Sequence, residues 1–353
     1  MAINVGAVIT GFTTPAIVQQ SCFGHEKDCY AYAYGQYVVS NLIFNLRTLD
    51  VQLLCSLLGI IPPAGVFLPW IVLKCVFSCI FKYFADGRKK ELFEYGIDDY
   101  TPQMLAEVRE VATMFVVLLP APIFWMAYDQ YGSTFQNQYD QLAYIKFGSV
   151  EIDSSTSSNW NTIFIIVLIP IFNIWVYPFI EKRFGNFKLL DRMLVGMFLT
   201  SVAFISIGIL QKFIDDSGSL VLDPESNALI CDQANPGKCL SGWWQVIPYF
   251  IIGVAEILFS ISGLNFTYSE VGSSMKAVSS SLWLLMVSIG NFLTVLIAVW
   301  YKTLGPQNFF YVNAALLFGA MLIYFFIRTQ YVYKIDRKSV EQSIAVGEEK
   351  LKH

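Results

Sequence analysis

Charge and histidine are scarce in this chain of 353 residues. Only 14% of the residues are charged, against about 25% in an average soluble domain, and the two histidines are His25 and His353. Two histidines leave little from which to build a metal site or a histidine-based catalytic centre. A phosphate-binding glycine loop and a catalytic serine motif are also missing. The sequence gives no support for an enzyme, a cofactor or a metal, and a net charge of -4 gives none for a nucleic-acid partner.

Long apolar runs are the main feature of the sequence. Hydrophobic residues make up 55% of the chain and aromatic residues 16%. About 17 to 25 apolar residues suffice for a helix that crosses a bilayer. We therefore expect an all-α, polytopic transmembrane protein with spans at 1–19, 29–46, 111–128, 154–180, 193–211, 277–301 and 303–327, and an eighth within the run from Cys239 to Ser269.

A single glutamate interrupts the run from Cys239 to Ser269. This residue, Glu256, has no other charge near it in the sequence. An ionised acid at the centre of a spanning helix costs roughly 2.5 to 3.5 kcal/mol on insertion scales. We expect Glu256 to face a cavity, a partner or a substrate.

The segment between the second and third spans is different in character. Four helix breakers, Pro62, Pro63, Gly65 and Pro69, interrupt it. We expect an amphipathic interfacial helix over 66–81 that leads into a charged linker. The predicted layout is a pair of helices at 1–46, an irregular segment and linker at 47–110, a six-helix bundle at 111–328 and a tail at 329–353.

Lysine and arginine are distributed unevenly between the two ends of the spans. If the first span leaves the cytosol, sixteen lie in cytosolic segments and five on the other side. This positive-inside bias predicts a cytosolic C-terminus. The start at Met1 lacks the basic flank and cleavage site of a signal peptide.

The seven cysteines fall into two groups. Cys22 and Cys29 bracket one expected external loop, and Cys231 and Cys239 lie in another, so each pair is a candidate disulfide, with free thiols as the alternative. The other three are expected to be buried apolar residues: Cys55, Cys75 and Cys79.

Three blocks of sequence resemble the proton-coupled oligopeptide transporter family. The first is GVAEILFSISGLNFTYS from Gly253, followed by SMK and by SLWLLMVSIGN from Ser281. The second is FWMAYDQYGS from Phe124, which is similar to the family's seventh helix. The third comprises IPIFN from Ile169 and the later VYP, which are similar to its eighth. AINVGA near the start resembles the fifth helix, and the resemblance is weakest between about 41 and 75.

The resemblance implies a major-facilitator fold in which two six-helix bundles alternate access to a central cavity. It also implies that the family's first four helices have no counterpart here, and with them a Glu-x-x-Glu-Arg motif and a lysine. We therefore expect that Met1 is not the start of the active protein.

Part of the family's peptide-binding site has matching residues in this chain. Its amino-end ligands match Asn4, Asn161 and Glu256, and a pocket aromatic matches Trp283. Two amide oxygens and a carboxylate suit an ammonium group, which offers three donors. The family's gating aspartate matches Asp129, to which the resemblance gives a gating or proton-linked role, as it gives Glu256 a proton-linked one.

This chain departs from the family at several positions. Thr113 stands where the family's arginine pairs with the aspartate, and Asn265 stands where a second acid is usual. Lys276 matches a Met-Lys pair and is interpreted as a cytosolic anchor. Residues 41–61 are the least family-like, and an alternative exon or a mistaken reading frame would explain them.

Three interpretations remain open. The first is proton-coupled symport of di- and tripeptides at the plasma membrane, with this chain as a truncated form and protons as the coupling ion. The second is a non-transporting partner that restrains a complete transporter through its exposed face. The third is transport of nitrate, histidine or another small solute. Glu256 favours a cationic amine over nitrate, because a carboxylate repels an anion. Lysosomal or vacuolar membranes and the oligomeric state stay open.

Overall fold

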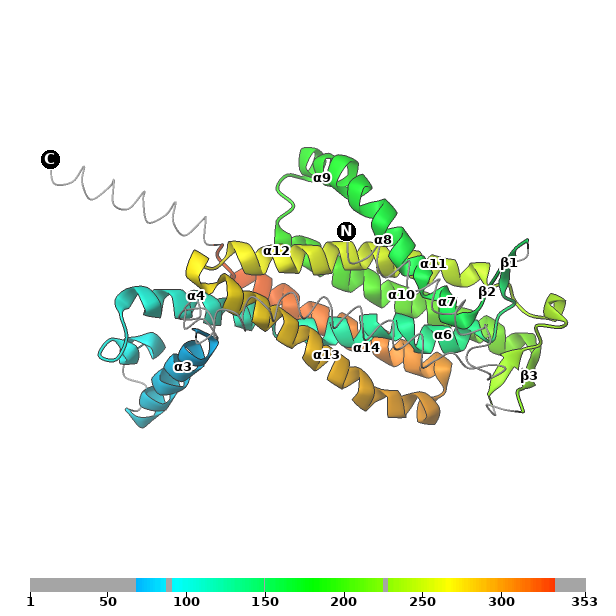
Figure 1. The fold of residues 1–353 in the computed structure, drawn as a ribbon, viewed down its shortest axis with the longest axis horizontal. Coiled ribbons are helices and arrows are strands. Elements are labelled where there is room, and N and C mark those ends of the chain that lie inside the picture. The colour runs from blue at the N-terminus through cyan, green and yellow to red at the C-terminus, as the bar shows by residue number, and fades with distance from the viewer. Residues whose placement is uncertain (1–67, 87–90, 149, 225–227, 334–353) are drawn as a thin grey trace, which may run out of the picture.

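The computed structural model describes residues 68–86, 91–148, 150–224 and 228–333. The expected spans at 1–19 and 29–46 lie outside these residues. Within them the chain is mostly helical and forms a long bundle, with two short hairpins at one end and α3 (Leu68–Ala85) at the other (Figure 1). The predicted all-α class is confirmed.

Five helical runs are long and apolar enough to cross a membrane by length and composition, and a bent pair of helices is a sixth candidate. The five runs are Ser154–Arg183, Leu189–Ser217, Trp243–Ser269, Ser273–Leu304 and Pro306–Gln330. Each of the last six spans expected from the sequence falls on one of these runs or on the bent pair. Most of the helices extend beyond the uncharged runs, because charged residues also occupy helix ends, whereas the last begins at Pro306, three residues after the expected start at 303.

The bent pair corrects two expectations. Helix α4 (Pro102–Leu118) begins well before the predicted boundary at 110, because Thr101 caps it by accepting a hydrogen bond from the Met104 N–H at 3.4 Å and Pro102 suits the first helical turn. The expected span at 111–128 is not continuous. It breaks before α5 (Ala121–Tyr128), and the axis bends by 46°. Two prolines, Pro120 and Pro122, lie at this break.

Helix α3 packs against the linker that follows it. Its buried face includes Val72, Cys75 and Cys79, spaced as one side of a helix, and Cys79 lies against Gly96 in the 3-10 turn η1 (Leu92–Gly96). Lys82 near its end forms an ion pair with Asp99. The helix runs four residues beyond its expected end at 81, and the prediction that Cys75 and Cys79 are buried is confirmed.

The two hairpins close one end of the bundle. Strand β1 (Ile145–Phe147) pairs antiparallel with β2 (Val150–Ile152), and β3 (Leu220–Leu222) pairs antiparallel with β4 (Leu229–Cys231). Between α5 and the first hairpin lie the 3-10 turn η2 (Asp129–Gly132) and α6 (Thr134–Tyr139). Cys231 forms a disulfide with Cys239, while Cys22 and Cys29 lie outside the described residues.

All the remaining elements except the 3-10 turn η4 belong to the spanning runs. Two of these runs contain a π-helical turn in their middle. In order these elements are α7 (Ser154–Ser157), α8 (Asn159–Ile171), the π turn η3 (Phe172–Val176), α9 (Tyr177–Phe184), α10 (Leu189–Ser217), the 3-10 turn η4 (Pro236–Lys238), α11 (Trp243–Glu256), the π turn η5 (Ile257–Ile261), α12 (Ser262–Ser269), the 3-10 turn η6 (Ser273–Met275), α13 (Lys276–Leu304) and α14 (Pro306–Gln330).

The end opposite the hairpins is held by polar contacts. Arg328 near the end of α14 forms an ion pair with Asp191 at the start of α10. Directly after α14, the Tyr331 hydroxyl donates to Glu270 at 2.7 Å. The segment assigned to the tail from 329 onward therefore begins with two more helical residues and a short packed stretch.

Candidate functional site

Glu256 lies in the middle of a membrane span. It is the last residue of α11, in a run of 27 residues from Trp243 to Ser269, and is partly buried. The π turn η5 follows it directly. Such turns inside α-helices occur often at functional sites.

Three helices bring polar groups together at this carboxylate. The hydroxyl of Tyr128, the last residue of α5, donates to Oε2 of Glu256. The Nδ2 of Asn161, in the first turn of α8, donates to the same oxygen at 3.2 Å and to the Tyr128 hydroxyl at 3.1 Å. Hydrogen bonds to a charged group are worth roughly 1.5 to 3 kcal/mol each, so both partners offset part of the cost of the buried carboxylate.

The cluster leaves acceptor atoms for a further donor. Both hydrogen bonds end on Oε2, so Oε1 of Glu256 accepts none from the described residues. The Oδ1 of Asn161 is buried and also has no partner among them. Buried polar atoms are usually paired, which makes this oxygen a place where a ligand or water would bind. A donor with several N–H groups fits these two oxygens.

A glycine on α11 permits the approach of α8. A Cβ at Gly253, one turn before Glu256, would lie 3.2 Å from Phe164 Cβ and 3.3 Å from Asn161 Oδ1. These contacts are tighter than ordinary van der Waals packing, so a larger residue would push α8 away from the carboxylate. Asn161 and Glu256 were both expected at the site, and the structure brings them together.

Tyr128 was missed by the sequence prediction. It lies within the block FWMAYDQYGS and immediately before Asp129. Its hydroxyl at the end of an apolar run was only a weak signal: a buried phenol needs a hydrogen-bond partner, but Thr113 in the same run also carries a hydroxyl. Its ring lies 4.9 Å from that of Tyr131, centroid to centroid.

Trp283 lies in a buried aromatic cluster beside these residues. Its ring centroid is 5.9 Å from that of Trp125 and 6.0 Å from that of Phe259, and Trp125 is 5.5 Å from Tyr128. The indole packs directly on Gly263 of α12, where a Cβ would lie 2.2 Å from its Cη2. Trp283 is thus connected to the carboxylate cluster through Trp125, and its exposed fraction is only 5%.

Asp129 opens the turn η2 and is half-buried. The amide of Asn291 on α13, oriented so that its nitrogen donates, bonds the Asp129 carboxylate and the Val287 carbonyl. No ion pair within the described ranges includes Asp129. The aspartate therefore has a neutral amide as its partner.

Arg109 and Thr113 do not reach Asp129. Arg109 forms an ion pair with Glu91 at 3.1 Å, and the Thr113 hydroxyl donates to the Arg109 carbonyl at 2.8 Å.

The other residues singled out from the sequence lie apart from the cluster. Asn4 is outside the described residues. Asn265 is exposed on α12, and Lys276 begins α13. The described part of the site therefore consists of Tyr128, Asn161 and Glu256, with the aromatic cluster around Trp283 beside it.

Comparison with known proteins identifies the family. The sequence model of the POT family matches residues 85–307, which is more than half of the chain. The chain belongs to the POT family.

Relatives in this family align with about two thirds of this chain, and the aligned part is about one third of each relative. Solute carrier family 15 member 1 of Oryctolagus cuniculus is 30% identical over 244 residues, which cover 67% of this chain and 34% of the relative. Peptide transporter PTR_A of Candidozyma auris is 30% identical over 210 residues, which cover 60% and 34%. The chain spans about one third of the length of these curated relatives.

Solved structures show the same fold. A crystal structure of the POT family transporter PepTSo superposes with a TM-score of 0.65 at 20% identity and covers 94% of this chain and 70% of that one. An auto-inhibited POT family peptide transporter gives a TM-score of 0.58 at 20% identity, with 92% and 58% covered. The POT-family chain is thus a multi-pass integral membrane protein with this transporter fold.

Proposed function

We propose that this chain supplies the amino-end half of the substrate site in a transporter that carries di- and tripeptides across a membrane together with protons. The cluster of Tyr128, Asn161 and Glu256 carries the proposal. A peptide's terminal ammonium has three N–H donors, and Oε1 of Glu256 and Oδ1 of Asn161 are two acceptors without partners among the described residues. A neutral or anionic solute would leave the Glu256 charge uncompensated.

Transport needs more than this cluster. A peptide also has a carboxylate, and the described residues near Glu256 include no lysine or arginine to bind it. The resemblance assigns that role to helices that precede those matched here. We therefore assign transport to a form that includes both bundles, in which this chain corresponds to the C-terminal one.

We propose protons as the coupling ion and no cofactor. Glu256 and Asp129 are acidic side chains within the described spans whose partners on other helices are neutral, whereas Asp191 and Glu181 are paired with arginines. Protonation would change the charge that each presents to those partners, and so couple proton binding to helix contacts.

The plasma membrane is the proposed location, with the C-terminus in the cytosol. The sixteen-to-five distribution of basic residues supports the orientation. The disulfide between Cys231 and Cys239 lies at the hairpin end, which this orientation places outside the cell, where disulfides persist.

Uptake of a labelled dipeptide at acidic and neutral external pH tests the proposal. Cells would express this chain, and any longer form, with Glu256 intact or as Glu256→Gln. The substitution keeps the shape of the side chain and removes its charge. The apparent affinity of saturable uptake for the dipeptide should therefore fall roughly 10- to 150-fold, which is equivalent to losing ~1.5 to 3 kcal/mol of binding free energy. Glu151→Gln, at an exposed ion pair in the first hairpin, is the matched control and should leave uptake unchanged.

A blocked peptide shows whether the carboxylate binds the amine. An N-acetylated dipeptide lacks the ammonium, so the wild type should bind it poorly and Glu256→Gln should bind it no worse. Equal loss for free and acetylated peptides on Glu256→Gln would refute the assignment of the amine to this residue.

A further inference from the structure

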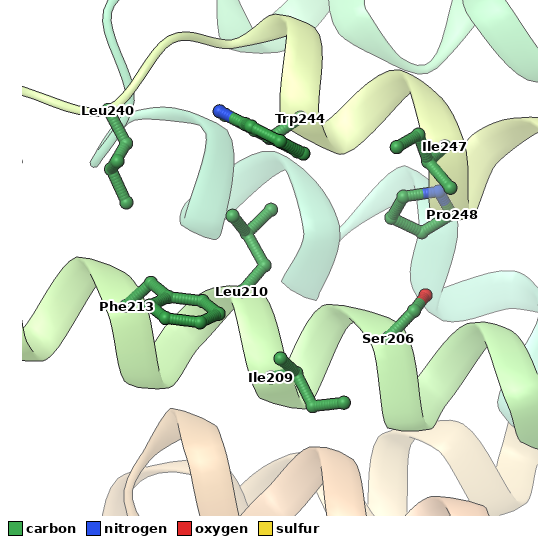
Figure 2. Close-up of a pocket in the computed structure, with 8 residues that line it drawn as sticks. All are labelled: Ser206, Ile209, Leu210, Phe213, Leu240, Trp244, Ile247 and Pro248. Carbon is green, nitrogen blue, oxygen red and sulfur yellow. The ribbon is translucent and has the colours of Figure 1, made fainter.

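An apolar groove lies on the outside of the bundle between α10 and α11, near the hairpin end (Figure 2). Its volume is about 340 Å³. Ile209 and Phe213 of α10 and Trp244 and Ile247 of α11 form the walls, and each is between 45% and 60% exposed. Leu210 points from α10 into the space below Trp244 (Figure 2) and is only 8% exposed. The groove therefore has an open mouth and a closed apolar floor.

The lining side chains carry only two polar groups. The Ser206 hydroxyl donates to the Ala203 carbonyl at 2.7 Å, and the other group is the indole N–H of Trp244 (Figure 2). A polar solute or peptide backbone in this groove would lose most of its hydrogen bonds to water and gain few. An alkyl chain loses nothing on entering.

The groove lies in the outer part of one membrane leaflet. Helix α11 begins at Trp243, and tryptophans at helix ends are typical of the membrane–water interface. Pro248, at the other end of the groove, lies five residues further along, about 7 Å deeper at 1.5 Å per residue. On α10 the lining residues Ser206, Ile209 and Leu210 belong to the uncharged run 193–211, so the inner part of the groove lies at the depth of the acyl chains.

A hydrogen-bonded wedge from α6 keeps the groove open. On the inner side of the two helices, the Gln138 Nε2 donates to Gln211 Oε1 at 2.8 Å, and Gln245 Nε2 donates to Gln138 Oε1 at 3.2 Å. Further along, α10 and α11 touch, since a Cβ at Gly196 would lie 2.9 Å from the Ala255 carbonyl oxygen. The helices are thus in contact at Gly196 and are separated by Gln138 beside the groove.

The loop before α11 fixes the outer edge of the groove. Leu240 lines it, and its carbonyl accepts a hydrogen bond from the Ala143 N–H at 2.8 Å. The preceding residue, Cys239, is bonded to Cys231. Because the wedge and this loop both hold the walls in place, the groove exists before any ligand binds, which lowers the cost of binding.

We propose that this groove binds one acyl chain of a phospholipid from the leaflet next to the hairpins. A transmembrane helix of another protein fits poorly, because such interfaces need small residues for close approach and the walls here are bulky. A sterol, whose hydroxyl would lie at the interface on the side of the Trp244 indole, is the alternative that the experiment below separates from an acyl chain. The site is separate from the Glu256 cluster and does not depend on the substrate proposed above.

Photolabelling in vesicles tests the site. The full chain is reconstituted in phosphatidylcholine vesicles that contain a phospholipid with a photoreactive group in its acyl chain, and adducts are mapped by mass spectrometry. Labelling of Phe213 and Ile247 should exceed, several-fold, that of Leu296 and Val299 on α13, which are at least as exposed on average. Adducts in proportion to exposure alone would overturn the proposal.

Two variants separate groove binding from general lipid contact. Ile247→Trp places a larger side chain in the groove and should remove the excess labelling at Phe213. Leu296→Trp makes the same kind of change on an exposed face of α13 and should preserve it. Unchanged labelling in Ile247→Trp would overturn the proposal, as would stronger labelling of the groove by a photoreactive sterol. Absence of lipid adducts at Phe213 and Ile247, the result expected if a protein helix covers the groove, would overturn it as well.

Discussion

The contact between Gly263 and Trp283 gives a sharp test of the packing beside the site. Gly263→Ala would place a Cβ 2.2 Å from Cη2 and 2.5 Å from Cζ3 of the indole. Neither distance is sterically allowed, so the ring or the helix must move by more than an ångström. The ring has little freedom, because Trp125 and Phe259 pack against it.

The expected cost comes from overpacking. Forcing extra atoms into a well-packed core typically costs about 1 to 3 kcal/mol. At about 2.1 cal/mol/K per residue, a chain of 353 residues shifts by roughly 1.3 °C per kcal/mol, so Gly263→Ala should lower the thermal unfolding midpoint by about 1 to 4 °C. Purified protein in one detergent, heated at one scan rate, provides the measurement.

A matched glycine isolates the steric effect. A Cβ at Gly319, within α14, would meet no atom within 4 Å, so Gly319→Ala should hold or raise the midpoint through alanine's better helix propensity. Trp283→Phe shortens the ring, and Gly263→Ala should cost less in that background than in the wild type. The reasoning is wrong if both glycine variants behave alike or if the costs of Gly263→Ala and Trp283→Phe simply add.

Three further predictions concern the ends of the bundle. Cys239→Ser opens a loop of eight residues to Cys231 and should cost about 2.5 kcal/mol by loop-closure entropy, with a reductant lowering the wild-type midpoint but not the variant's. Cys75 and Cys79 are buried, and burial raises the pKa of the Cys75 thiol to about 12, so both should resist maleimide at pH 7 to 8 until the protein is unfolded. Arg192→Ala loses an ion pair with the exposed Glu181, a hydrogen bond to the Phe187 carbonyl and a contact with the Tyr177 ring, and should lower the midpoint more than Arg192→Lys.

Most of the fold can be predicted from the lengths of the apolar runs in the sequence. An apolar run of twenty or more residues in lipid has to satisfy its backbone groups internally, so each such run predicts a helix. The exception among the described runs is 111–128, where composition alone hid the break between α4 and α5. Pro120 and Pro122 were visible in the sequence, but proline is common in membrane helices, and only the packing shows that the axis bends.

The candidate site was less predictable. Glu256 was found because a charge is costly in the bilayer, and Asn161 was found through the family resemblance. Tyr128 bears no charge and resembled its apolar neighbours, so its role depends on a contact between residues 128 positions apart. The neutral partner of Asp129 was also missed, since an asparagine on α13 is not marked by any local pattern.

The π turn after Glu256 explains why the helical run from Trp243 to Ser269 presents Glu256 and Gly263 to different neighbouring helices. Gly263 lies seven residues after Glu256, so in a regular α-helix both would share one face. A π turn adds one residue to the turn and so rotates the rest of the helix by about 100°. In the structure Glu256 contacts Tyr128 and Asn161 on α5 and α8, whereas Gly263 packs on Trp283 of α13. The carboxylate and the aromatic cluster are adjacent because the backbone is irregular between them, and periodicity in the sequence does not reveal that irregularity.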